Sequence, residues 1–267
     1  MKVKFITCSG VNETTDIPAL IALALEFPIA EFGVQISGEK CHYGSERFKW
    51  INDLARYAEQ QHIMLNMAFH VNRSWAEGCG QNHVTHALRD LLDLRDYNGD
   101  AFAKRVQLNF KIGREKEPDE EKLTRFIQSI RPRRCILSHN SSNEELIHRL
   151  HNNGVLFDSL YDESFGEGIV PEQRKAPAFT YITQGYAGGI SPGNVYQTMT
   201  DIYKNWLHSP NTTGVWIDAE GMLHRSAKLK KAFSDACMFS EGDTLMLKTL
   251  VESLFELELV SLDDIDK

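Results

Sequence analysis

Short apolar runs alternate with amphipathic stretches along most of the chain. The amphipathic stretches repeat apolar residues at helical spacing, as Phe48, Ile51 and Leu54 do. Strands that alternate with helices favour parallel pairing. The predicted strands are Val3–Thr7, Phe32–Ile36, Ile63–Phe69, Val106–Phe110, Cys135–Leu137, Val155–Phe157, Phe179–Thr183 and Gly214–Ile217.

A helix or a helix-bearing connection is predicted after each of these strands, with Arg73–Asn82 as a polar loop and Tyr161–Pro177 as a long glycine-bearing one. Eight such units predict an α/β fold of the (β/α)8 barrel type, with one extra C-terminal helix packed outside. An open doubly wound sheet is the alternative, but no G-x-G-x-x-G follows the first strand. The predicted helices are Ile17–Phe27, Ser45–Gln61, His83–Leu94, Asp119–Ile130, one opening at Ser142, Ser191–Leu207, Ala227–Met238 and Asp243–Leu257.

The chain length of 267 residues suits one barrel domain over residues 1–267. A formal net charge of −8 disfavours nucleic acid and anionic membrane as partners. The sequence has no apolar run long enough to span a membrane. Its five cysteines include no C-x-x-C pair, which favours a reduced, cytoplasmic protein. We therefore expect a small-molecule substrate, no metal or cofactor, and a monomer or homodimer.

Active sites of (β/α)8 barrels lie at the carboxyl ends of the strands, so the polar residues there are the candidates. Side chains alternate along a strand, and on this pattern Cys8 shares a face with Ile6, and Asp158 with Leu156. Both Cys8 and Asp158 could therefore point into the barrel. The polar strand-end residues are Cys8, Ser9, Gln35, Ser37, His70, Asn72, Gln107, Asn109, Ser138, His139, Asn140, Asp158, Gln184, Gly188, Gly189, Asp218 and Glu220.

Several strand ends resemble those of phosphoribosylanthranilate isomerases, enzymes of tryptophan biosynthesis in the ribulose-phosphate-binding barrel superfamily. The seventh-strand pattern of that family, S-G-G-L-x-P-x-N-V, is similar to A-G-G-I-S-P-G-N-V at 187–195, and its S-x-R loop to S-E-R at 45–47. Its V-F-V-N, V-Q-L-H-G and L-L-D runs are similar to residues 69–72, 106–109 and 156–158. Its opening K-I-C-G-I-T-N run is similar to C-S-G-V-N at 8–12.

The resemblance implies an isomerase that carries out an aldose-to-ketose Amadori rearrangement on a sugar phosphate. In it Cys8 would be the general base and Asp158 the general acid. Arg47 and Gln107 would contact the substrate, and the turn at Gly188 and Gly189 would bind phosphate. A thiolate and a protonated carboxyl at neutral pH require a lowered and a raised pKa, respectively.

The eighth strand end departs from the family pattern. The family has V-S-S-G-V-E there, whereas this chain has Asp218, Ala219 and Glu220. A carboxylate beside a phosphate is unfavourable, so Asp218 and Glu220 are expected either to contact a different ligand group or to point away.

Two alternatives remain open from the sequence. His70 and His139 could join Asp158 or Asp218 around a divalent metal, as in metal-dependent barrel epimerases and lyases. The altered eighth strand end also fits a non-catalytic barrel that binds a ligand and has a degenerate phosphate site.

Overall fold

Eight strands in the order β1 to β8 form a closed barrel, and each strand pair whose register is described is parallel. This computed structural model describes residues 1–110, 118–163, 168–191 and 193–219. The predicted (β/α)8 barrel is confirmed. The strands are β1 (Val3–Val11), β2 (Ala30–Ile36), β3 (Met67–Asn72), β4 (Ala103–Asn109), β5 (Arg134–His139), β6 (Asp158–Tyr161), β7 (Gln184–Tyr186) and β8 (Val215–Ala219).

Helices follow the strands at most of the predicted places. Capping side chains set several of their first turns: Asp16, Ser45, Thr85 and Asp119 each accept a hydrogen bond from a backbone N–H of the helix that follows. The two predicted helices Ala227–Met238 and Asp243–Leu257 lie outside the described residues. The helices in the described part are α1 (Ile17–Glu26), α2 (Glu46–Gln60), α3 (Ser74–Gly80), α4 (His86–Leu92), α5 (Glu120–Ser129), α6 (Glu144–Asn152) and α7 (Val195–Trp206).

The chain divides into two compact units, and the single-domain organisation stays a prediction. Unit 1 comprises Met1–Ser9, Thr14–Glu31 and Leu160–Lys267. In its described part β8 pairs with β1 on one side and with β7 on the other. Gly185 of β7 pairs with Trp216 of β8, whose fully buried ring fills the space beside the glycine.

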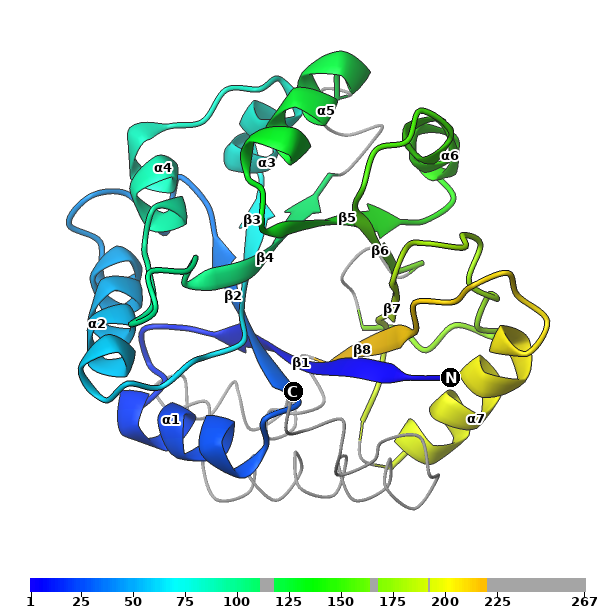
Figure 1. Ribbon diagram of the computed structural model, residues 1–267, viewed down its shortest axis with the longest axis horizontal. Coiled ribbons are helices and arrows are strands. Elements are labelled where there is room, and N and C mark those ends of the chain that lie inside the picture. The colour runs from blue at the N-terminus through cyan, green and yellow to red at the C-terminus, as the bar shows by residue number, and fades with distance from the viewer. Residues whose placement is uncertain (111–117, 164–167, 192, 220–267) are drawn as a thin grey trace. The chain divides into compact units, whose positions relative to one another are not determined.

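Unit 2 comprises Gly10–Glu13 and Phe32–Ser159. Its strands β2, β3, β4 and β5 pair in sequence order, and α2, α4 and α5 lie on the outer side of them (Figure 1). On these strands buried apolar residues such as Val34, Phe69 and Leu108 alternate with polar ones. This alternation produces one apolar face and one polar face.

Three predicted elements are wrong. The apolar run Val155–Phe157 precedes β6 instead of forming it, and Leu156 is 48% exposed. Phe179–Thr183 precedes β7, where Asn211 Nδ2 donates to the Phe179 and Ile182 carbonyls and so satisfies backbone groups that a ladder would otherwise use. The polar loop Arg73–Asn82 contains α3, which forms because its Trp75, Ala76 and Cys79 side chains are buried.

None of the helices in the described part of the chain combines the length and apolar character needed to span a bilayer.

Candidate functional site

Two buried carboxylates of unit 1 accept hydrogen bonds from alternate residues of β1. Thr7 Oγ1 donates to Glu31 Oε1 at 2.8 Å, and Ser9 Oγ donates to Asp218 Oδ1. Thr7 and Ser9 are two residues apart, so their side chains lie on the same face of the strand. Asp218 also pairs in register with Thr7 and is 9% exposed. Asp218 lies near the carboxyl end of β8, whereas Glu31 is the second residue of β2. Each buried acid has a hydroxyl donor that offsets the cost of its burial.

Cys8 lies on the other face of β1. It shares a face with Ile6, as expected, but this face is apolar: Ile6 pairs with Ile217, and Cys8 pairs with Ala219. Burial, and then the negative charges of Asp218 and Glu31, raise the pKa of the Cys8 thiol far above its ordinary value. These surroundings oppose the thiolate that a general base requires. The role of Cys8 as a base stays a prediction that its position does not support.

Asp158 is the first residue of β6, so its predicted place at the carboxyl end of a strand is wrong. Its Oδ1 accepts hydrogen bonds from Arg134 Nη2 at 2.7 Å and from Arg134 Nε at 3.2 Å, and its Oδ2 lies 3.6 Å from Arg105 Nη1. Arg134 opens β5, and Arg105 is the third residue of β4. The carboxylate therefore joins the amino ends of three strands, away from the end where barrel active sites lie.

Arg47 is engaged by two partners in unit 2. Its Nε forms an ion pair with Glu13, and its Nη1 donates to the Gln35 carbonyl at 2.9 Å. Ser45 caps α2 just before it, which places the guanidinium against the end of β2. Arg47 thereby ties α2 to this strand end and to the segment after β1, and its contact with a substrate stays a prediction.

Gln107 belongs to a ladder of side-chain amides on the polar face of β3 and β4. Gln107 Nε2 donates to Asn109 Oδ1 at 2.8 Å, and Asn109 Nδ2 donates to Asn72 Oδ1 at 2.8 Å. Ser138 Oγ, from β5, also donates to Asn109 Oδ1, at 3.1 Å. Strand register produces the ladder, because His70 pairs with Gln107 and Asn72 with Asn109.

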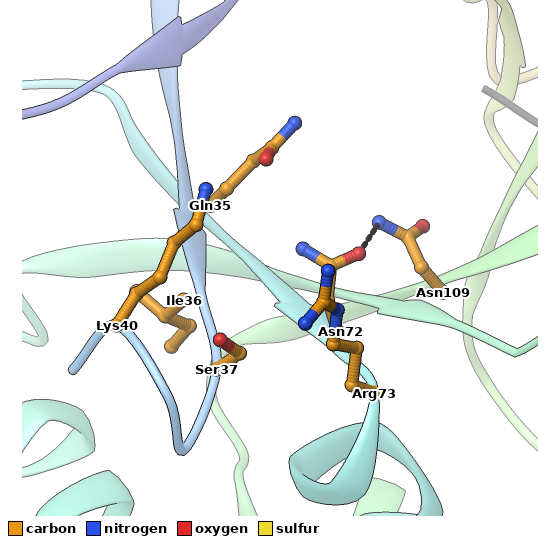
Figure 2. Close-up of a pocket in the computed structure, with 7 residues that line it drawn as sticks. All are labelled: Gln35, Ile36, Ser37, Lys40, Asn72, Arg73 and Asn109. Atoms are coloured by element: carbon orange, nitrogen blue, oxygen red, sulfur yellow. Dashed lines mark hydrogen bonds between the residues drawn. The ribbon is translucent and has the colours of Figure 1, made fainter. Parts of the chain in front are cut away.

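A cavity of about 240 Å³ lies at the carboxyl ends of β2, β3 and β4 beside this ladder. Figure 2 shows Lys40 and Gln35 on one side of it and Asn72, Arg73 and Asn109 on the other. Sequence reasoning singled out the amides as strand-end residues but missed Lys40 and Arg73. Both cations sit in segments that follow strands, where a charged residue ordinarily indicates a solvated loop.

Gly188 and Gly189 pack against their own chain. A Cβ at Gly188 would lie 2.7 Å from the Ile169 carbonyl oxygen, and one at Gly189 would lie 2.4 Å from a Val170 methyl. Arg174 donates to the carbonyls of residues 187 and 188. The glycines are explained by this close approach and by their positive φ angles of 88° and 61°. Phosphate binding at this turn stays a prediction.

His70 and His139 do not converge on a common site. His70 lies on the face of β3 that carries Asn72, whereas His139 lies on the face of β5 opposite Ser138. His139 Nδ1 lies 3.0 Å from Ser159 Oγ, and its ring packs against that of His148. Among the described residues, no three His, Cys, Asp or Glu side chains gather as metal ligands would. Glu220 lies outside the described residues.

The solved structures that are similar to this chain include two enzymes. One is a phosphoribosylanthranilate isomerase from Thermotoga maritima, crystallised as monomers of a dimeric enzyme, with 17% identity and a TM-score of 0.49 over 95% of this chain and 98% of that one. The other is a variant tryptophan synthase alpha-subunit from Pyrococcus furiosus, with 10% identity and a TM-score of 0.50 over the same shares. At such identity the second likeness shows the barrel fold alone. No family model and no curated protein matches the sequence.

Proposed function

We propose that this chain is an isomerase-type enzyme that moves a proton between neighbouring carbons of a small sugar or sugar phosphate, with Asp218 as the acid–base group. One observation carries the proposal: the Asp218 carboxylate is buried near the carboxyl end of β8 and is held by the Ser9 hydroxyl. Strand ends of this kind are where (β/α)8 barrels place their catalytic residues.

The reaction class moves two protons: one from the carbon beside the carbonyl to the carbonyl carbon, and one from the hydroxyl oxygen to the carbonyl oxygen. The carbon-to-carbon transfer needs one group that removes the first proton and returns it to the neighbouring carbon. A carboxylate does both, since it accepts the proton as a base and delivers it as the acid that results. The Ser9 hydrogen bond sets the orientation of the Asp218 carboxylate, which makes Ser9 a positioning residue. Glu31, held by Thr7 at 2.8 Å, supplies a second buried carboxylate in the same unit.

This assignment keeps the reaction class that the resemblance implies and changes the residue that performs it. Asp218 replaces Cys8 as the base because the Cys8 thiol lies on the apolar face of β1 and its pKa is raised. Asp158 is not used, because both of its oxygens face arginine side chains at the amino ends of the strands.

The test is uptake of solvent deuterium at carbon, followed by proton NMR, with a panel of aldose and ketose phosphates and the phosphoribosyl amine of the isomerase family. We expect the wild-type protein to exchange at least one of these compounds. Asp218→Asn should slow that exchange at least ~100-fold, the lower range for loss of a general base. Asp201→Asn, on α7 and half-exposed, is the matched control and should keep the wild-type rate.

Two further variants separate the possible roles. Ser9→Ala leaves the Asp218 carboxylate in place but removes its donor, so we expect slower exchange with a shifted pH profile. Cys8→Ala should retain exchange. A wild-type protein that exchanges none of the panel would overturn the proposal, and so would an Asp218→Asn protein that is folded and fully active.

A further inference from the structure

We propose that the cavity at the carboxyl ends of β2, β3 and β4 binds the phosphate group of a small molecule. The cavity lies within unit 2 and is lined by Gln35, Ile36, Ser37, Lys40, Asn72, Arg73 and Asn109. None of the described residues that line it is acidic.

Two cations supply the charge that a phosphate dianion requires. Lys40 stands in the turn after β2, which is closed by hydrogen bonds from the N–H groups of residues 40 and 41 to the Ser37 carbonyl. Arg73 directly follows β3. Its ion pair with Glu39 has both side chains more than 60% exposed, so it is a weak contact that a bound anion can displace.

The amide ladder borders the same space with the side chains of Asn72 and Asn109. Asn109 Oδ1 is already occupied by Gln107 and Ser138, and Asn72 Oδ1 by Asn109. Asn72 Nδ2 also donates to the His70 carbonyl at 2.9 Å. A side-chain amide has two N–H groups, and the ladder uses one from each asparagine. The groups left to a ligand in the cavity are therefore N–H donors more than oxygen acceptors.

Arg73 is held in a strained backbone conformation beside the cavity. Its φ of 55° and ψ of −136° fall in a region that residues with a Cβ rarely adopt. Such strain persists where surrounding packing dictates it, and it gathers at ligand sites. Here the packing is that of buried Trp75, the second residue of α3, which approaches Gly38 so closely that a Cβ added there would lie 2.9 Å from Trp75 Nε1. This contact holds the Lys40 turn next to Arg73.

The arrangement of donors favours phosphate over carboxylate. They come from three separate segments, after β2, at the end of β3 and at the end of β4, as Figure 2 shows. A tetrahedral anion with several oxygens can meet donors from three directions, whereas a planar carboxylate meets them best in one plane. The cavity volume of about 240 Å³ also leaves room for the carbon chain that carries the phosphate.

The test is calorimetric titration of the full chain with inorganic phosphate, ribose 5-phosphate, ribose and acetate. We expect both phosphates to bind and ribose and acetate to bind at least ~10-fold more weakly, because they lack the dianion. Lys40→Ala and Arg73→Ala should each weaken phosphate binding ~10-fold, a loss typical of one charge-assisted contact. Lys49→Ala and Arg56→Ala, exposed cations on α2, make the same charge changes and should bind as the wild type does.

Three results would overturn the site. They are no phosphate binding at millimolar concentration, wild-type phosphate affinity in Lys40→Ala and Arg73→Ala, or a loss of affinity in Lys49→Ala and Arg56→Ala as large as that in the two cavity variants. The last would indicate a general charge effect. Circular dichroism of each variant confirms that it is folded. Because the readout is binding, the outcome is independent of the role proposed for Asp218.

Discussion

The Asp158 carboxylate accepts a 2.7 Å hydrogen bond from Arg134 Nη2, and the two residues are the first of β6 and of β5. Arg105 lies on the other oxygen, with its side chain only 3% exposed. A carboxylate placed between two arginine side chains at the amino ends of strands is positioned to hold the strands together. This relationship leads to a prediction about stability.

Replacing Asp158 with Asn should lower the free energy of unfolding by ~3 kcal/mol, because it removes a negative charge that faces the buried Arg105 side chain and the Arg134 side chain. Urea denaturation measures the change. Asp93→Asn, at a 65% exposed side chain, is the control and should stay within ~0.5 kcal/mol of wild type. Unchanged stability in Asp158→Asn, together with lost deuterium exchange, would instead restore this residue as a catalytic acid.

The Cys41 thiol should make stability depend on alkaline pH. Burial raises its pKa from 9.0 to about 11, so the folded chain keeps a proton that the unfolded chain has lost. This contribution is fully present below pH 9.0 and is lost as the pH rises through about 11. In Cys41→Ala the fall in unfolding free energy over this window should be smaller by ~1–2 kcal/mol. Urea titrations across the window measure it, and identical pH profiles for the two proteins would contradict it.

Gly185→Ala should destabilise unit 1. The added methyl would lie 2.3 Å from the Trp216 ring and 2.7 Å from a Leu160 methyl, and both of these side chains are buried. Overpacking of this kind costs ~2–3 kcal/mol, which thermal or urea denaturation would report. Gly193→Ala, whose nearest contact would be 3.9 Å away, is the control. Equal stability of the two variants would show that Trp216 can shift.

Arg73→Gly should stabilise the fold while weakening phosphate binding. Glycine adopts a φ of 55° without strain, so the free energy of unfolding should rise by ~1 kcal/mol. The same change at Arg56, inside α2, should lower it by ~1 kcal/mol, because glycine disfavours helix there. Urea denaturation and phosphate titration of both variants test the pair. A loss of stability in Arg73→Gly equal to that in Arg56→Gly would show that Arg73 is not strained.

The sequence by itself determined the barrel. Apolar runs separated by amphipathic stretches can bury their apolar faces by parallel pairing with helices outside, and this local pattern predicted most elements to within a few residues. It also identified Gln107 and Asp218 as polar strand-end residues. The pattern failed at 155–157 and 179–183, where apolar residues are buried outside the ladder, and at α3, where burial of Trp75 and Cys79 overrides a loop-like composition.

Only the tertiary structure decided which of the polar residues face one another. Alternation along β1 does not say which face is apolar, so the sequence could not separate Cys8 from the Ser9 and Thr7 face. A shift of the β6 start to Asp158 moves that carboxylate from one end of the strand to the other. Lys40 and Arg73 join the amides because strand register and the Gly38–Trp75 contact bring two loops together. These relationships depend on contacts between residues distant in sequence, which the local pattern does not encode.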